Sequence, residues 1–298
     1  KNNITMSLFG GFLRIVANEK SIAVSGGLKR TKMNIAQKII EAHKLKFGSL
    51  PPLQQCSVSG SALFNADCMD ILPLIPDKSV SLILADLPYG TTDNNEWDKT
   101  LDLGVLFEHY DRIIKDNGII LLYAQQPFAS DLINAYRKNF RYEFIWEKTK
   151  PVGFFNAKKM PLRSHENILV FYKKLPKYNP ILEDCNKKVK RPDESGVYGT
   201  RRSRSNEYTM TKTGYPRTVL KYTNVFNPQL HPTQKNVELN EFLINLFTDE
   251  GDMVLDNTMG VGTTCLGAKE LNRRFIGIEK EVKYYELAVG RVFGQHCH

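Results

Sequence analysis

The sequence lacks the patterns that mark several large classes of protein. No run of about 20 apolar residues, the length of a membrane-spanning helix, occurs in its 298 residues. It has no Cys-x-x-Cys pair, and its five cysteines are scattered and odd in number. This argues against a zinc or disulfide framework and favours a reducing cytoplasm. The absence of Gly-Lys-Ser/Thr argues against a phosphate-binding P-loop as well.

Acidic residues are outnumbered by basic ones, and the imbalance is local. The formal net charge is +9, and the stretch from Lys173 to Tyr222, with thirteen basic and five acidic residues, holds +8 of it. A basic stretch is commonly only a solvated face, but this one also has five tyrosines. Cations for phosphates, with polar and aromatic groups for bases, favour a DNA-binding surface. The residues that we expect at DNA include Lys187, Lys188, Lys190, Arg191, Arg201, Arg202, Arg204 and Arg217.

A polar tip follows the apolar run from Val80 to Ala85. The run predicts a buried strand, and the next residues are Asp86-Leu87-Pro88-Tyr89. A carboxylate accepts N–H hydrogen bonds, and a tyrosine ring stacks on a flat group. The tip therefore suits a flat, nitrogen-bearing ligand, although a strand that ends in a polar turn is often only structural.

A second polar tip lies near the C-terminus. The residues from Met253 to Asp256 predict a strand, followed by a glycine loop, a helix from Cys265 to Leu271, and a strand that ends at Glu279. This layout is typical of a nucleoside-binding βαβ unit, in which the final acidic residue accepts bonds from ribose hydroxyls. The loop has Gly-Val-Gly but lacks the third glycine of the dinucleotide fingerprint. A nucleoside without a pyrophosphate, such as S-adenosylmethionine, fits this pattern, and a purely structural turn is the alternative.

Together these motifs resemble the amino-methylating DNA methyltransferases. That family's reaction motif is Asp/Asn/Ser-Pro-Pro-Tyr, and its cofactor loop often reads Asp-Pro-Phe-Met-Gly-Ser-Gly-Thr-Thr; here the loop reads Asp-Asn-Thr-Met-Gly-Val-Gly-Thr-Thr from Asp256. A His-Pro-Thr-Gln-Lys-Pro motif often precedes the loop, as residues 231–236 do here with Asn236 in the last place. The reaction motif comes first and the cofactor loop last, which is similar to the family's β group of N6-adenine and N4-cytosine enzymes. Further matches are residues 153–159, 163–166 and 215–217, and the resemblance spans residues 60–293.

The resemblance implies an α/β fold, with a Rossmann-like S-adenosylmethionine-dependent methyltransferase sheet. The sheet is expected to be circularly permuted, mostly parallel, with one reversed strand near an edge and an inserted target-recognition region. The expected organisation is an N-terminal extension of unknown role at 1–58, the catalytic half of the core at 59–172, the target-recognition insert at 173–228 and the cofactor-binding half at 229–298. Met33 is a candidate start, which would make the first 32 residues an adventitious leader.

Apolar periodicity predicts the remaining elements of the core. Helices are expected over 34–46, 103–115, 128–137, 237–247 and 284–292. Strands are expected over 62–66, 119–124, 140–146 and 166–172. Asn117-Gly118 is expected to stop the second of these helices.

The resemblance also implies roles for individual residues. Asp86 and the Leu87 carbonyl would accept the amine hydrogens of a flipped base, Pro88 would shape the turn, and Tyr89 would stack on the base. The residues expected at the S-adenosylmethionine cofactor are Asp67, Cys68, His231, Thr233, Lys235, Asp256, Thr258, Gly260, Gly262, Thr263 and Glu279. For Asp67 a simple helix cap, and for His231-Pro232 a turn before a helix, are the structural alternatives. No metal site is expected, since a frayed tail is the simpler interpretation of Cys297-His298.

The function implied is transfer of a methyl group to adenine N6 in double-stranded DNA. No Pro-Cys sequence is present, which argues against the covalent route of ring-carbon methylation and favours direct transfer. Cytosine N4 is the alternative target, and a degenerate DNA-binding protein without turnover is the alternative of another class. Leu87, Asn257-Thr258 and Asn236 depart from the family pattern and leave room for an altered enzyme. A bacterial or phage source, restriction–modification, a homodimer and a cognate restriction endonuclease are further expectations.

Overall fold

The computed structural model describes residues 6–9, 12–15, 33–49, 53–56, 60–90, 101–190, 207–224 and 234–294. The chain divides into two compact units, Lys1–Met33 and Asn34–His298. In the first unit, β1 (Met6–Phe9) pairs antiparallel with β2 (Phe12–Ile15). All the sequence motifs lie in the second unit.

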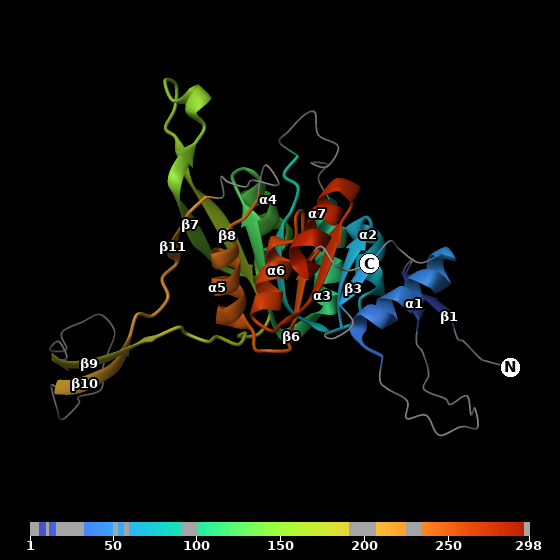
Figure 1. The fold of residues 1–298 in the computed structure, drawn as a ribbon, viewed down its shortest axis with the longest axis horizontal. Coiled ribbons are helices and arrows are strands. Elements are labelled where there is room, and N and C mark those ends of the chain that lie inside the picture. Colours follow the sequence, from blue (N-terminus) through green and yellow to red (C-terminus); the bar gives the residue numbers. More distant parts are fainter. Residues whose placement is uncertain are drawn as a thin grey trace. The chain divides into compact units, whose positions relative to one another are not determined.

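The second unit is built on a large sheet. Among the described residues this sheet has nine strands, in the order β11-β7-β8-β6-β5-β12-β13-β4-β3 (Figure 1). In that order the strands are β11 (Val219–Tyr222), β7 (Phe140–Val152), β8 (Arg163–Phe171), β6 (Ile114–Ala124), β5 (Val80–Asp86), β12 (Met253–Asp256), β13 (Arg274–Glu279), β4 (Ser61–Asn65) and β3 (Leu53–Cys56). Since β12 and β13 lie between β5 and β4, the sheet is assembled from both ends of the chain, as the permuted motif order predicts.

Strand directions follow the expected pattern. The neighbours from β6 through β5, β12 and β13 to β4 are all parallel. β8 is antiparallel to both β6 and β7, which confirms one reversed strand near an edge. At the other edge β3 is also reversed, and this strand was not predicted from the sequence. The carboxyl ends of the parallel strands therefore open onto one edge of the sheet, where ligands bind in folds of this kind.

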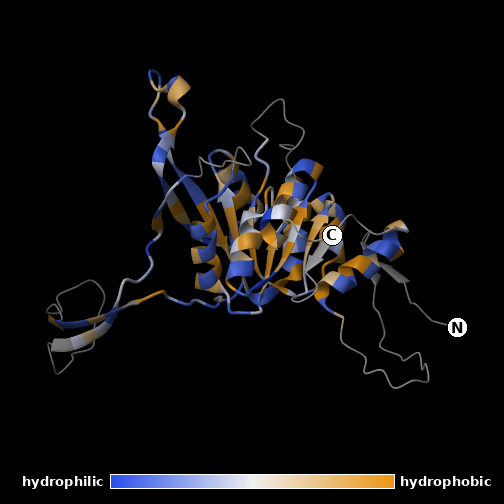
Figure 2. Cartoon of the chain, in the orientation of Figure 1, coloured by the Kyte–Doolittle hydropathy of each residue, from blue (hydrophilic) through white to orange (hydrophobic). Residues whose placement is uncertain are grey.

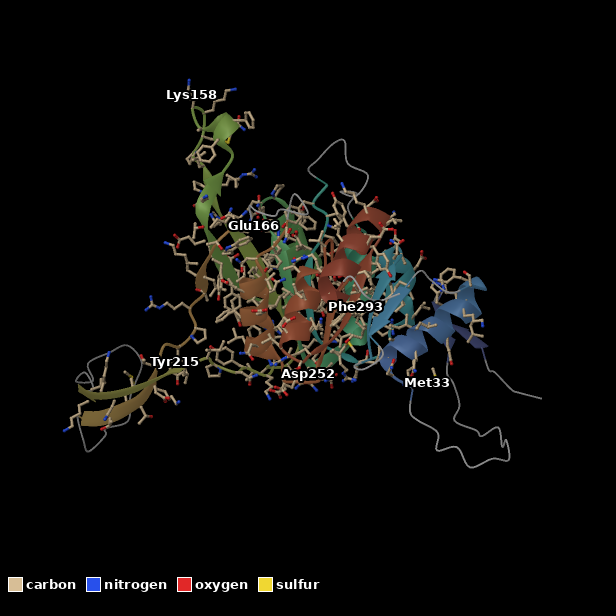
Figure 3. The ribbon with its side chains drawn as sticks, in the orientation of Figure 1. Met33, Lys158, Glu166, Tyr215, Asp252 and Phe293 are labelled. Atoms are coloured by element: carbon tan, nitrogen blue, oxygen red, sulfur yellow. The ribbon has the colours of Figure 1, made fainter. Side chains whose placement is uncertain are left out.

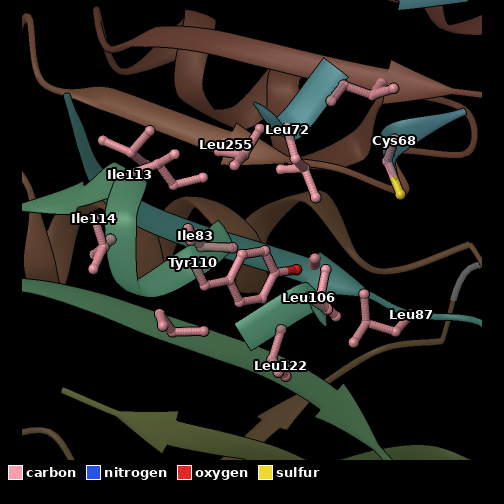
Figure 4. Close-up of a cluster of buried hydrophobic side chains, with 14 of the residues drawn as sticks. Cys68, Leu72, Ile83, Leu87, Leu106, Tyr110, Ile113, Ile114, Leu122 and Leu255 are labelled. Carbon is pink, nitrogen blue, oxygen red and sulfur yellow. The ribbon is translucent and has the colours of Figure 1, made fainter. Parts of the chain in front are cut away.

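Helices cover both faces of the sheet (Figure 1). One face carries α1 (Ile35–Phe47), α2 (Cys68–Ile71), α3 (Leu103–Ile113) and α4 (Phe128–Ala135). The other carries α5 (Val237–Phe247), α6 (Thr263–Glu270) and α7 (Val282–Phe293). Ile83 of β5 packs in the first cluster and Leu84 in the second, and because both faces of β5 are covered its sequence is a continuous apolar run. Figure 4 shows the first cluster around Tyr110, and Figure 2 shows apolar residues concentrated on the strands.

Polar side chains cap the helices where the sequence supplies them. Asn34 and Gln37 form a reciprocal capping box at the start of α1. The Asn236 side chain accepts a hydrogen bond of 2.8 Å from the backbone N–H of Leu239 and so caps α5. Asn236 replaces the family's proline at this position, and capping gives the replacement a local physical reason.

The boundary between α3 and β6 differs from the prediction. The helix ends at Ile113 and the strand begins at Ile114, so Asn117-Gly118 lies inside the strand and does not stop the helix. A Cβ on Gly118 would lie 2.7 Å from the Ile114 side chain and 3.0 Å from the Ser81 carbonyl oxygen. Close packing between β6 and β5 therefore requires a glycine at this position. The Asn117-Gly118 pair resembles a helix stop only in sequence.

Two segments contain more strand than the sequence predicts. β7 and β8 extend beyond 146 and before 166 and form a long hairpin. Within the basic stretch, β9 (Glu183–Lys190) pairs antiparallel with β10 (Glu207–Thr213) as a separate two-stranded sheet.

No helix in the described part of the chain has the length and apolar character needed to cross a bilayer. The predicted domain boundaries stay predictions, although α1 belongs to the same compact unit as the sheet.

Candidate active site

Four polar residues meet at the carboxyl edge of the sheet. Asp86, Asp256 and Glu279 are the last residues of β5, β12 and β13, which are adjacent parallel strands. Glu279 is in register with Asn65, the last residue of β4. The two tips that the sequence places 170 positions apart, Asp86 and Asp256, are thus brought to neighbouring strands of one edge.

Asp86 is held by a hydrogen-bond donor on each oxygen. The Tyr89 hydroxyl donates to Oδ1 over 2.8 Å, and the Lys235 ammonium lies 2.8 Å from Oδ2. Burial raises the pKa of the Asp86 carboxyl, and Lys235 opposes that shift. The Asp86 backbone carbonyl accepts from the Thr258 hydroxyl over 3.0 Å, which joins the reaction tip to the glycine loop. The Leu87 side chain, where the family has proline, is buried in the core.

Behind Asp86 lies an alternating row of buried charges. Lys235 Nζ is 3.0 Å from Glu166 Oε2 as well as 2.8 Å from Asp86, and the Lys148 ammonium pairs with Glu166 Oε1. Burial alone would raise the pKa of Glu166, but the two lysines outweigh it and hold that pKa at about 2. The two carboxylates likewise raise the pKa of Lys235 against the effect of its burial. The row is therefore a compensated cluster of two carboxylates and two ammonium groups.

A cation–π contact and two neutral hydrogen bonds connect this cluster to the helices. Lys235 Nζ lies 4.9 Å from the centre of the Tyr123 ring. The Tyr123 hydroxyl donates to Asn240 Oδ1 over 2.5 Å, and Asn240 Nδ2 donates to the Thr264 hydroxyl over 3.1 Å. These links fix α5 and α6 against the sheet beneath the site.

The glycine loop between β12 and α6 has the expected backbone. Gly260 and Gly262 have φ values of 52° and 73°, which favour glycine. The Gly260 N–H donates to Glu279 Oε2 over 2.9 Å, and the Glu281 N–H donates to the other oxygen over 2.8 Å. Each carboxylate oxygen has a second lone pair, so Glu279 can still accept from a ligand. Thr263 begins α6 and is buried, with Arg291 Nη1 3.3 Å from its hydroxyl.

Asp256 is a buried carboxylate with like charges around it. Burial raises its pKa to about 7; the Thr264 hydroxyl and the Thr258 N–H lower it, and Asp86 and Glu279 raise it further. The Thr258 N–H donates to Asp256 Oδ1 over 3.2 Å. This part of the edge is rich in negative charge, which favours a ligand that carries positive charge.

The β4 end of the edge contains Asp67 and Cys68. Asp67 caps α2 by accepting from the Met69 N–H over 2.9 Å, and its other oxygen lies 3.3 Å from Lys280 Nζ. The structural alternative for Asp67 is therefore realised, with its cofactor role still a prediction. Cys68 is buried, which raises the pKa of its thiol to about 12. Such a thiol stays protonated at neutral pH and is not a nucleophile.

The expected DNA-binding residues are only partly described. Lys187 and Lys188 are exposed on β9, and Arg217 is exposed before β11. Lys190 ends β9. Arg191, Arg201, Arg202 and Arg204 lie outside the residues that the structure describes, as do His231 and Thr233, which were expected at the cofactor.

Sequence reasoning found Tyr89 but missed most of the buried residues behind Asp86. Lys235 was expected at the cofactor, but its ammonium contacts Asp86 and Glu166. Glu166 belongs to a stretch that matches the family and had no role assigned; an acidic residue at the start of an apolar strand was the available signal. Lys148 and Tyr123 gave no signal, because only the fold brings them to the site.

Comparisons with known proteins agree on one family. A family model described as DNA methylase, N6_N4_Mtase, matches residues 80–290. The chain is 27% identical to the type II methyltransferase M.BglII of Bacillus subtilis over 253 residues, which are 78% of this chain and 69% of that protein. It is 28% identical to the type II methyltransferase M.HindIII of Haemophilus influenzae, over 77% of this chain and 94% of that one.

Solved structures show the same fold. The crystal structure of the M1.HpyAVI–SAM complex matches with a TM-score of 0.53 and 26% identity, covering 77% of this chain and 97% of the other. The PvuII DNA methyltransferase, which is cytosine-N4-specific, matches with a TM-score of 0.56 over 80% of this chain and 88% of its own. At 17% identity the second likeness concerns the fold alone.

Proposed function

This chain belongs to the N6/N4 family of DNA methylases, whose model matches residues 80–290, and on that premise we propose that it methylates adenine N6 at specific sites in double-stranded DNA. The methyl donor is S-adenosylmethionine. The observation that supports the reaction most directly is Asp86, a partly buried carboxylate at a strand tip with donors on both oxygens. An aspartate at the head of the reaction motif favours adenine over cytosine N4.

The residues at the carboxyl edge fit S-adenosylmethionine chemically. The molecule has a sulfonium and an ammonium group, and Asp256 and Glu279 supply negative charge in a buried setting. Gly260 and Gly262 leave the loop backbone without side chains. We assign Asp256, Thr258, Gly260, Gly262 and Thr263 to the methionine end of the cofactor.

Other residues complete the proposed cofactor site. Glu279 holds the ribose through its remaining lone pairs, and Asp67 and Cys68 lie toward the adenine. His231 and Thr233 are assigned to the same site from the sequence motif alone. When bound, the cofactor supplies an electrophilic methyl group on a positive sulfur.

Asp86 and Leu87 orient the target amine in this proposal. The lone pair of an exocyclic amine is delocalised into the base, so the amine is a weak nucleophile. Asp86 and the Leu87 carbonyl accept its two hydrogens and draw the nitrogen toward tetrahedral geometry, so alignment and electrostatics supply most of the rate. As the N–C bond forms, the nitrogen becomes acidic and its proton passes to Asp86, whose raised pKa favours that transfer.

Two neighbours of Asp86 have defined roles. The Tyr89 hydroxyl donates to Asp86 Oδ1, whose second lone pair can accept from the entering amine while the Tyr89 ring stacks on the base. Lys235 stays on Oδ2 and holds the carboxylate in place. Taking the base out of the duplex costs a few kcal/mol, which contacts to the flipped base and to the DNA backbone must offset.

The test is methyl transfer from labelled S-adenosylmethionine to unmethylated phage DNA, followed by nucleoside digestion and mass identification. We expect N6-methyladenine from the wild type and none from Asp86→Asn, which keeps the size of the side chain. Asp77→Asn is a matched control, because Asp77 precedes β5 and pairs with Arg112 outside the site. N4-methylcytosine would keep the mechanism and change the base, whereas DNA binding without product would favour a degenerate binding protein.

A further inference from the structure

The hairpin formed by β7 and β8 has an ordered tip of unusual composition. Glu147 is in register with His165, and Val152 with Arg163 further out. Gly153, with φ of 94°, turns the chain into a single 3₁₀ turn over Phe154–Asn156. Four backbone hydrogen bonds of 2.8–3.1 Å among residues 153–160 close the tip. The tip is thus a compact, hydrogen-bonded turn that holds its side chains in a defined arrangement.

Apolar side chains on this tip point into solvent. Phe155 is fully exposed, and Phe154 and Met160 are 66% and 56% exposed. Figure 2 shows apolar residues at the end of the hairpin, beyond the body of the sheet. Single exposed apolar residues are ordinary, but three within seven residues of one turn, two of them phenylalanines, indicate a contact surface.

The charge of the hairpin identifies the kind of partner. Residues 149–165 include four basic residues and no acidic one. They are Lys150, Lys158, Lys159 and Arg163, whereas Lys148 is buried against Glu166. Such a surface repels a second copy of itself and attracts a polyanion.

The base of the hairpin is part of the active site. Lys148 on β7 and Glu166 on β8 belong to the charge row that ends at Asp86. In Figure 3, Glu166 lies at the base of the hairpin and Lys158 at its far end. From Glu147 to Val152, where β7 ends, the strand rises about 17 Å, more than the roughly 12 Å width of the major groove of DNA. A duplex with one base in the Asp86 site would therefore meet the tip.

We propose that Phe154 and Phe155 form a wedge that inserts into duplex DNA beside the target and stabilises the flipped base, while Lys158 and Lys159 contact the flanking phosphates. Apolar wedges between base steps are an established means of opening a duplex, and aromatic side chains stack on any base. The inference rests on the proposed function, because it assigns the hairpin to the step that brings the base to Asp86. It differs from sequence recognition, which we assign to the basic stretch.

The first test compares methylation of double-stranded and heat-denatured phage DNA. We expect Phe155→Ala to lower kcat/KM on duplex about 10- to 100-fold, the value of one base–aromatic stack, and to change it little on single strands. Leu45→Ala is the control, since Leu45 is 79% exposed on α1 and has no place in the proposed surface. Equal losses on both DNA forms, or no loss on duplex, would overturn the wedge.

The second test does not depend on methyl transfer. A Phe155→Trp variant places a fluorophore at the tip, and the signal of the two native tryptophans is subtracted using the wild type. We expect duplex DNA to quench this tryptophan and shield it from acrylamide, and the Lys158→Ala, Lys159→Ala double variant to weaken that response. Shielding that follows protein concentration without DNA would assign the tip to a second copy and refute the proposal. If the wild type makes no methylated base, quenching by duplex still decides the role of the hairpin.

Discussion

Replacing Glu166 with glutamine tests the buried charge row. Glu166 and Lys148 side chains are 8% and 9% exposed, and Lys235 is equally buried between Glu166 and Asp86. In the wild type, two carboxylates balance two ammonium groups. Glu166→Gln keeps the size of the side chain but leaves the cluster with one uncompensated positive charge. Removing one partner of a buried ion pair costs about 3–5 kcal/mol, so we expect a loss of free energy of unfolding in that range.

The assay is urea denaturation of the wild type and the variant, with the slope compared to confirm that the same surface unfolds. Glu147→Gln is the matched control, because Glu147 is the neighbouring strand residue, is 46% exposed and pairs with Lys221 at 3.4 Å. Such an exposed pair contributes at most about 1 kcal/mol. Since the folded pKa of Glu166 is about 2, below its unfolded value, its contribution is complete above the unfolded pKa and is lost as the pH falls toward 2. A Glu166→Gln loss no larger than that of Glu147→Gln would refute the reasoning.

Other predictions concern the cofactor loop and two glycines. The pKa of Asp256 is about 7 in the folded protein, above the pKa of the same carboxyl in the unfolded chain. The unliganded protein should therefore lose stability as the pH rises from the unfolded pKa of Asp256 to 7. S-adenosylmethionine should bind about tenfold more weakly for each pH unit below 7. Calorimetric titration at several pH values checks this, and Asp256→Asn should abolish the dependence. Gly277→Ala should destabilise the fold by about 1–3 kcal/mol in thermal or urea unfolding, since its Cβ would lie 2.4 Å from Met259 Sδ and 2.7 Å from Cys265 Sγ. Gly290→Ala, in α7 with nothing within 4 Å of the added atom, should instead stabilise it by about 0.5–1 kcal/mol.

Much of the fold was predictable because apolar runs and turn residues agree with it. The strands at β5, β12 and β13, and the helix α5, begin and end close to where the sequence places them. The end of α3 was not predictable, because Gly118 imitates a helix stop while serving close strand packing. β3 and β9 were missed because their sequences have no apolar alternation, and neighbouring strands alone hold them extended.

The site was predictable only where local chemistry marks it. A carboxylate after an apolar run identified Asp86, and glycines before a helix identified the loop at Gly260. Lys148 and Glu166 are separated by 18 positions and meet only because β7 and β8 form a hairpin. Their roles depend on burial and pairing, which no local pattern reveals.

The most direct test of the central claim is the nucleoside content of DNA from a bacterial host without adenine methylases that expresses either the wild type or Asp86→Ala. Both proteins must be equally abundant and folded. The account predicts N6-methyladenine in the DNA of cells with the wild type and none above background in those with the variant. Equal N6-methyladenine from both would contradict it, because the amine would then be methylated without the carboxylate that is proposed to hold it.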